Sequence, residues 1–198
     1  MSHSLQCQCG QVRGHLNHPE TSTRIACYCK DCQAFAHFLG KAGEMLDAQG
    51  GSDIAVSHPQ HIVFTSGVES LACMSLSHTG MLRWFTSCCN SPIGNTARDK
   101  KMAFIGLSTL CLAGPPVSLD SALGPVRMLS CTQGARGHVT PSGLAAVPVL
   151  LGFGVKLLRA RLSGSWRTNP FFKLGSSEPI AEATVLKSEE TARLKAIA

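Results

Sequence analysis

The stretch that most constrains this chain is Cys27-Tyr28-Cys29-Lys30-Asp31-Cys32, which places three thiols within six residues. Residues i and i+2 of a strand point to the same face, so Cys27 and Cys29 at a strand end would direct two sulfurs to one point. Cys32 would follow at the start of a helix, whose N-terminus favours the negative charge of a thiolate. The pattern predicts a metal site, and zinc is the metal that we expect.

Three sulfur ligands would leave a tetrahedral zinc ion one ligand short. Structural zinc sites usually have four protein ligands, whereas catalytic sites keep one position open. The open position would admit water or an external thiol. Two alternatives stay open at this point: three buried thiols that hold no metal, and a closed structural site in which His37 or another residue is the fourth ligand.

Two further cysteine pairs flank the triplet, Cys7-Gln8-Cys9-Gly10 upstream and Cys88-Cys89 downstream. Such close pairs are poor internal disulfides. The N-terminus is polar and lacks the apolar run of a secretory signal, so we expect a cytoplasmic protein whose ten cysteines are metal ligands or buried thiols. Isolated cysteines are usually buried as small apolar groups, and we expect this of Cys73, Cys111 and Cys131.

Short segments rich in Val, Ile, Leu, Phe and Thr dominate the first 110 residues and are separated by turn signals. This pattern favours a mainly β fold over alternating strands and helices. One short helix is expected after Cys29, because Cys32, Phe35, Ala36 and Leu39 have helical spacing and Gly40 can end it. The expected strands are Gln11–Leu16, Thr23–Ala26, Asp53–Ser57, His61–Thr65, Ser70–Leu76, Met81–Thr86 and Met102–Leu107.

The pattern changes in the last third of the chain. Residues 143–155 are uncharged and largely apolar, and residues 156–162 are amphipathic. Because about 20 apolar residues are needed to cross a bilayer, a helix that is buried or attached to the surface is preferred over a membrane span. Another helix is expected to begin near Ser188. We therefore predict a zinc-binding domain over residues 1–135 and a helical extension over residues 136–198 that packs on it.

The net charge of +6 comes from the C-terminal half. Residues 98–198 hold 13 Lys and Arg against six Asp and Glu, whereas residues 1–97 hold five against six. A basic surface can attract an anionic partner, but no nucleic-acid-binding motif accompanies it. We interpret it as a solvated face and expect neither nucleic acid nor a membrane as the partner. The sequence does not indicate an oligomeric state.

Three motifs together resemble the glutathione-dependent formaldehyde-activating enzyme family, which also includes centromere protein V. They are Cys-x-Cys-Gly near the start, Cys-x-Cys-x-x-Cys about twenty residues later, and Arg-x-Phe-x-x-x-Cys-x-Ser-Pro-Ile from Arg83. The resemblance covers residues 5–110. It implies a zinc-holding β-tent of short antiparallel strands with a partly helical C-terminal extension, a structural zinc on the outer cysteine pairs, a second zinc on the triplet, and a carbon–sulfur lyase activity with glutathione bound nearby.

The residues match this family unevenly. Cys27, Cys29 and Cys32 match the ligands of the second zinc, and Cys7 and Cys9 match half of the structural site. In the late motif, Cys89 matches one family cysteine, but Thr86 stands where the other should be, and Asn90 replaces glycine. The resemblance therefore leaves three outcomes: a site of Cys7, Cys9, Cys88 and Cys89, a three-cysteine site with an outside ligand, or the loss of one zinc. We expect Cys89 to be a ligand and leave Cys88 open, since neighbouring strand residues point to opposite faces.

The function expected from these observations is a zinc-dependent, carbon–sulfur lyase-like reaction on an adduct of glutathione or another thiol, with one or two zinc ions. His37, five residues after Cys32, is the nearest candidate for the acid–base group, with a surface or packing role as the alternative. A second interpretation is a non-catalytic zinc module that contacts nucleic acid, protein or a membrane surface through its basic half. Thiol redox exchange is weaker, because no separate redox-type Cys-x-x-Cys is present.

Overall fold

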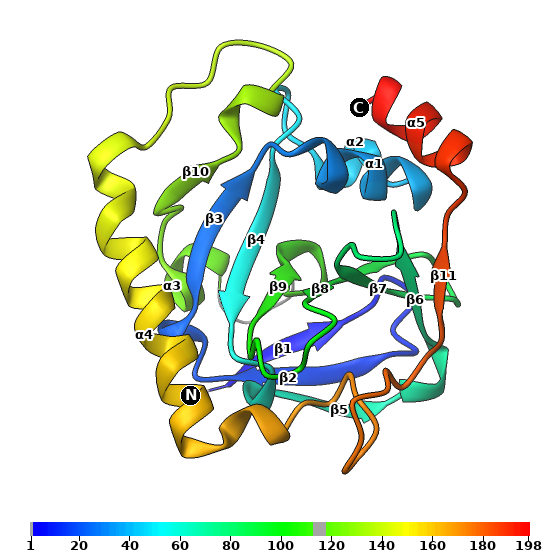
Figure 1. Cartoon of the computed structure of the whole chain (residues 1–198), viewed down its shortest axis with the longest axis vertical. Coiled ribbons are helices and arrows are strands. Elements are labelled where there is room, and N and C mark those ends of the chain that lie inside the picture. Colours follow the sequence, from blue (N-terminus) through cyan, green and yellow to red (C-terminus); the bar gives the residue numbers. More distant parts are fainter. Residues whose placement is uncertain (1, 113–117) are drawn as a thin grey trace.

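The computed structural model describes residues 2–112 and 118–198, and its two sheets make the chain mainly β (Figure 1). The smaller sheet has the order β1 (Ser2–Gln6), β2 (Arg13–Asn17), β5 (Ile62–Ser66). The larger one has the order β10 (Met128–Ser130), β3 (Thr23–Cys27), β4 (Ser52–Ser57), β9 (Ile105–Ser108), β8 (Pro92–Thr96), β7 (Leu82–Thr86), β6 (Leu71–Ser75), β11 (Ala183–Val185). The predicted fold class is confirmed.

All seven strands expected from the sequence are present, with ends that differ by at most three residues. The described residues contain four further strands that were not expected. Strand β1 has a largely polar sequence, but its side chains alternate between exposed and buried. Its buried His3 hydrogen-bonds the carbonyl of Leu112. Strand β8 begins with proline and contains Gly94, yet it is buried throughout. The other two, β10 and β11, have three residues each and pair in parallel with β3 and β6, unlike the antiparallel strands between them.

The main core includes residues that are far apart in the sequence. The ring of Trp84 on β7 lies 5.0 Å from that of Phe171, which in turn meets the edge of Phe64 at 5.6 Å. Both Trp84 and Phe171 are fully buried. Residues 169–172 therefore join the core, although the exact boundary of the predicted C-terminal extension stays a prediction.

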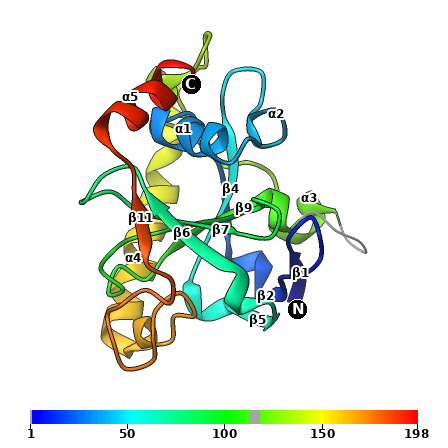
Figure 2. The same ribbon diagram turned by 90° about the vertical axis from the view of Figure 1, so that its right-hand side faces the viewer.

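The helices are α1 (Lys30–Phe38), α2 (Ala42–Met45), α3 (Leu119–Leu123), α4 (Val147–Ser163) and α5 (Ser188–Ala196). Gly40 follows α1 with a positive φ of 68°, as the sequence predicts for a helix end. Helix α5 packs on α1, and β11 leads to it along the edge of β6 (Figure 2). Lys195 of α5 pairs with Asp31 of α1 at 2.6 Å. The chain's last helix thus lies against the helix that carries Cys32.

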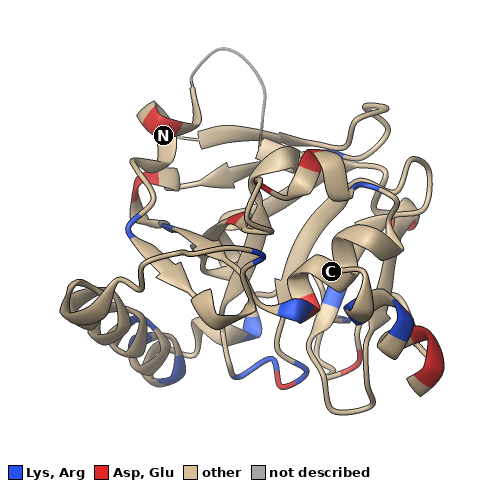
Figure 3. Ribbon diagram, turned by 90° about the horizontal axis from the view of Figure 1, so that it is seen from above, with Lys and Arg blue, Asp and Glu red and all other residues tan. Residues whose placement is uncertain are grey.

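Helix α4 is largely exposed. Among its residues only Ala160 is buried, so of the two arrangements expected for this helix, buried or attached to the surface, the second describes it. Figure 3 shows α4 with basic but no acidic residues. Within the described residues, the stretch Gly143–Ser163 has the length and mean hydropathy, 1.6, of a possible membrane span. Length and composition alone are weak evidence for a membrane, and the absence of a membrane partner stays a prediction.

Candidate metal centres

Four cysteine sulfurs meet where the two sheets approach each other. Cys7 and Cys9 lie in the turn after β1, and Cys88 and Cys89 lie in the turn after β7. The four Sγ atoms are all within 4.8 Å of one another. Cys9 Sγ lies 3.4 Å from Cys7 Sγ and 3.3 Å from Cys88 Sγ, and Cys88 Sγ lies 3.8 Å from Cys89 Sγ. These four residues form one cluster that could hold a metal ion.

The spacing suits a tetrahedral ion. Four sulfurs at about 2.3 Å from one zinc ion would lie about 3.8 Å apart, close to the separations seen here. The backbone N–H of Val12 also donates to Cys7 Sγ at 3.3 Å, and such a bond stabilises a thiolate. The donor set and its surroundings therefore fit a soft divalent metal.

Cys88, which the sequence left open, joins the cluster because residues 87–89 form a turn. The alternation of strand side chains ends at Thr86, so neighbouring cysteines are not forced to opposite faces. Thr86 itself is buried, and its hydroxyl lies 3.4 Å from Cys89 Sγ. Of the three outcomes left by the sequence, the structure brings together the set Cys7, Cys9, Cys88 and Cys89.

Asn90 closes this turn with a positive φ of 53°, and its N–H bonds the carbonyl of Thr86 at 2.8 Å. Asparagine tolerates the left-handed region better than most residues, whereas a β-branched side chain is strained there. We expect Asn90→Val to lower the free energy of unfolding by about 1–2 kcal/mol and Asn90→Gly to leave it nearly unchanged. Urea unfolding of the two variants measures this, and equal losses would show that the left-handed backbone is not the cause.

The second cluster is the triplet Cys27, Cys29 and Cys32, whose sulfurs also lie within 4.8 Å of one another. Cys27 is the last residue of β3, Cys29 is the N-cap of α1, and Cys32 lies in its first turn. The N–H of Cys32 donates to Cys29 Sγ at 3.3 Å. In residues 2–112 and 118–198, no fourth His, Cys, Asp or Glu side chain completes this cluster. The local prediction of a strand end followed by a helix start is confirmed.

Arg83 is the basic group beside the triplet. Its side chain is almost fully buried on β7, and its Nη1 lies 3.9 Å from Cys32 Sγ and 3.1 Å from Asn95 Oδ1. Its Nη2 lies 3.8 Å from the carboxylate of Asp31, and its guanidinium faces the ring of Phe35 at 5.6 Å. A buried guanidinium needs a nearby negative charge. A thiolate at Cys32 would supply that charge beside the carboxylate of Asp31.

The pKa values of Cys27 and Cys32 are shifted in opposite directions. Hydrogen bonds from Cys27 and then Cys29 lower the pKa of Cys32 well below its ordinary value, and the positive charge of Arg83 lowers it further. The pKa of Cys27 is raised, first by its hydrogen bonds to Cys29 and Cys32 and then by burial. These shifts favour ionisation of Cys32, whose sulfur lies 3.9 Å from Nη1 of Arg83, over that of Cys27.

A small cavity of about 20 Å³ adjoins Cys32. Ser52 and Asn95 line it with polar side chains, and Gly94 and Gly106 widen it by having none. The hydroxyl of Ser52 is buried and has no hydrogen-bond partner among the described residues. A cavity of this size can hold about one water-sized group. The polar atoms could bind a small oxygen-bearing group beside the sulfurs.

His37 lies farther along α1 and is half-buried. Five residues from Cys32 correspond to about 140° around a helix, so the two side chains lie on different faces. Its Nε2 lies 3.4 Å from Nη2 of Arg136, and none of the hydrogen bonds of the three sulfurs involves it. The structure thus does not bring His37 to the sulfurs, and Arg83 and Ser52 are the polar groups that sequence reasoning missed. The buried arginine was visible only as the first residue of the Arg-x-Phe motif.

The isolated cysteines differ from one another. Cys73 and Cys111 are buried as expected, and burial raises the pKa of each thiol to about 12. Cys131 is exposed, so its expected burial is wrong. It begins a short turn after β10 with a positive φ of 54°.

Comparison with known proteins identifies a family. No curated protein matches the chain. Among solved structures, it is similar to the crystal structure of a Rhodobacter sphaeroides protein, with 19% identity and a TM-score of 0.39 over 62% of this chain and 96% of that one. Residues 1–184 match a family described as "Family of unknown function (DUF6151)". Because the match spans most of the sequence, the chain belongs to the DUF6151 family.

Proposed function

We propose that the chain holds two zinc ions, one structural and one at a reactive site. The observation that carries the proposal is the contrast between the clusters: four cysteines meet in one, whereas three meet in the other without a fourth ligand among the described residues. Closed four-ligand sites are typical of structural zinc, and open three-ligand sites are typical of catalysis. Cysteine-only donor sets favour soft metals, of which zinc is the one without redox chemistry.

Charge supports a reactive role for the triplet. Three thiolates and one divalent ion carry a net charge of −1, and the buried guanidinium of Arg83 balances it. Among the described ion pairs, Arg83 has only the distant carboxylate of Asp31 at 3.8 Å, whose side chain is 45% exposed. The site can therefore accept an anionic group next to Cys32 at less electrostatic cost than an unbalanced sulfur cluster could.

The reaction that we propose is the cleavage, or formation, of the carbon–sulfur bond in a thiol–aldehyde adduct. In the cleavage direction, the carbon–sulfur electron pair leaves with sulfur, and the adduct's hydroxyl loses its proton to solvent as it becomes a carbonyl. Zinc, when bound, would supply a Lewis acid that favours the thiolate form of the substrate sulfur. The free hydroxyl of Ser52 and the amide of Asn95 lie where they can hold the adduct's oxygen.

The size of the cavity limits the substrate. At about 20 Å³ it takes only a small carbonyl group, so the body of the thiol must stay outside it. Cys29 is only half-buried, so the body of the thiol can lie on the solvent-facing side of the cluster, beside Cys29. The proposal therefore favours an adduct between a bulky thiol such as glutathione and a very small aldehyde.

Cobalt substitution tests the open site. We expect glutathione to change the thiolate-to-cobalt absorption of the cobalt-loaded protein, and S-methylglutathione, which lacks the free thiol, to leave it unchanged. Cys29→Ser should remove the response, whereas Cys9→Ser should keep it because it alters only the four-cysteine cluster.

Metal analysis of each variant accompanies the spectra. A cobalt spectrum indifferent to glutathione, with a triplet ion that does not exchange, would instead support a closed zinc module that acts through its basic C-terminal half.

A further inference from the structure

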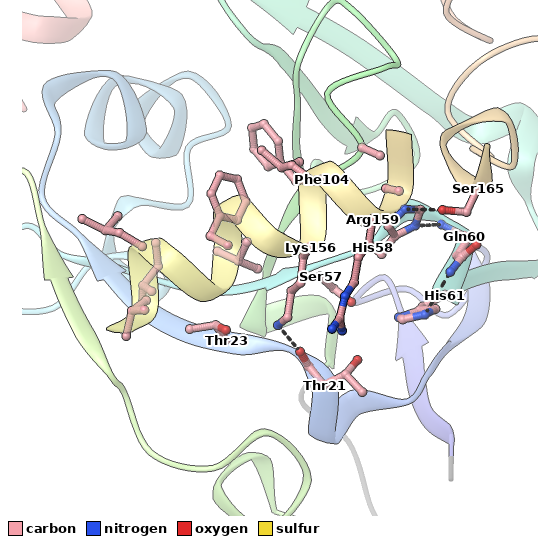
Figure 4. A pocket seen from close by; sticks show the side chains of 18 of the residues that line it. Thr21, Thr23, Ser57, His58, Gln60, His61, Phe104, Lys156, Arg159 and Ser165 are labelled. Carbon is pink, nitrogen blue, oxygen red and sulfur yellow. Dashed lines mark hydrogen bonds between the residues drawn. The ribbon is translucent and has the colours of Figure 1, made fainter. Parts of the chain in front are cut away.

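A cavity of about 560 Å³ lies between α4 and the face of strands β3 and β4 (Figure 4), and no cysteine lines it. Its volume is in the range of small-molecule sites, about 300–1,000 Å³. Apolar side chains from both walls line it: Ile25 and Val56 from the sheet, Phe153 and Leu157 from the helix, and Phe104 between them. The residues of α4 that line it run from Val149 to Ser163, which is about 21 Å of helix. The cavity is therefore elongated and mainly apolar.

One end of the cavity is polar and basic. Figure 4 shows Lys156, His58, Gln60 and His61 grouped near the C-terminal half of α4. The residues that line the cavity include no Asp or Glu. Lys156 and Arg159 form no ion pair with a carboxylate in the described parts of the chain, and Lys156 donates only to the backbone carbonyl of Thr21. Two cations thus lie at the rim without an anion.

Two polar atoms at this end also lack partners. The hydroxyl of Ser57 and Nδ1 of His61 are buried without a hydrogen bond within the described residues. Leaving such atoms unpaired costs free energy, so a ligand that bonds them would bind more tightly. Partial burial also lowers the pKa of Lys156, and a nearby anion would oppose that effect.

His58 of this group is not arranged as a catalytic base towards Ser165. Nδ1 of His58 accepts the backbone N–H of Gln60 at 3.1 Å, so its other nitrogen carries the proton and faces the hydroxyl of Ser165 at 3.2 Å. Burial, with a contribution from the charge of His61, lowers the pKa of His58 to about 4, which keeps it neutral. A neutral imidazole that donates to serine cannot activate it, so the geometry favours binding over hydrolysis.

We propose that this cavity binds a long-chain fatty carboxylate, with its acyl chain between α4 and the sheet and its carboxylate at the rim beside Lys156 and Arg159. The elongated apolar interior matches an extended acyl chain. The two unpaired cations and the absence of acidic lining residues match a single anionic head. The site shares no lining residue with either cysteine cluster, and its proposal does not rest on the function proposed for them.

Displacement of a fluorescent fatty acid by palmitate tests the proposal in the full-length, metal-loaded protein. We expect saturable binding of one palmitate per chain. Lys156→Gln with Arg159→Gln should weaken palmitate binding by about five- to tenfold and leave binding of uncharged hexadecanol unchanged. Arg161→Gln is the matched control, because this exposed cation of α4 does not line the cavity.

A second variant fills the cavity. Thr23 lies on β3 and lines the interior, so Thr23→Trp should abolish binding of both palmitate and hexadecanol while circular dichroism shows an unchanged fold. Equal palmitate binding by Thr23→Trp and the parent protein would overturn the proposal. So would the absence of saturable palmitate binding, including the case in which the protein binds only to vesicles of phosphatidylcholine and phosphatidylglycerol.

Discussion

Replacing Cys88 with serine is expected to reduce the bound metal from the proposed two ions to one per chain and to lower the free energy of unfolding by at least about 3 kcal/mol. The cluster joins the turn after β1, in the three-stranded sheet, to the turn after β7, in the eight-stranded sheet. Cys88 and Cys7 are 81 residues apart in the sequence. A metal that ties such distant segments contributes its binding energy to folding, and a neutral hydroxyl is a poor replacement ligand.

Thermal unfolding and metal analysis measure the effect. For a chain of this size the melting temperature should fall by roughly 6–12 °C, since 1 kcal/mol corresponds to roughly 2–4 °C. Cys131→Ser is the matched control, because Cys131 is an exposed cysteine outside both clusters. If the two variants kept the same metal content and melted together, Cys88 would not be a ligand.

Replacing Arg83 with methionine is expected to release the metal proposed for the triplet and to lower the free energy of unfolding by about 3–5 kcal/mol. The guanidinium is 3% exposed and is the cation nearest to the sulfur of Cys32. Methionine would fill similar space but would leave the sulfur cluster with an unbalanced negative charge in a region that excludes water. This unbalanced charge destabilises the folded state, so the decrease in the free energy of unfolding should be larger than for replacement of a surface arginine.

Urea unfolding with metal analysis gives the measurement. Arg161→Met on the exposed face of α4 serves as the control and should change the unfolding free energy by less than about 0.5 kcal/mol. Arg83→Lys keeps the charge but loses the planar fork, so it should retain part of the metal. Two bound ions in Arg83→Met, together with the stability of Arg161→Met, would contradict the role given to this side chain.

Much of the triplet was predictable because its geometry is local. The end of a strand and the N-terminus of the following helix bring Cys27, Cys29 and Cys32 together, and this arrangement needs no contact with distant parts of the sequence. The position of Cys88 was not predictable in the same way. The rule that neighbours point to opposite faces applies to a strand, and the strand ends one residue before Ser87.

The polar groups around the triplet could not be found by local reasoning. Arg83 and Asn95 come from β7 and β8, and Ser52 comes from β4, so their meeting depends on the order of strands in the larger sheet. The short strands β10 and β11 were missed for a related reason. A segment of three residues is too short to show alternating polar and apolar residues. β10 and β11 form strands because they pair with β3 and β6.

These two short strands have a consequence for self-association. They form both outer edges of the larger sheet, and each covers its longer neighbour over three residues. A long, flat sheet edge is a template for pairing with other chains and so for aggregation, whereas a short edge offers few free amide and carbonyl groups. Proteolytic loss of the segment that contains β11 would uncover β6, so limited digestion after residue 175 should make the remaining protein prone to precipitate.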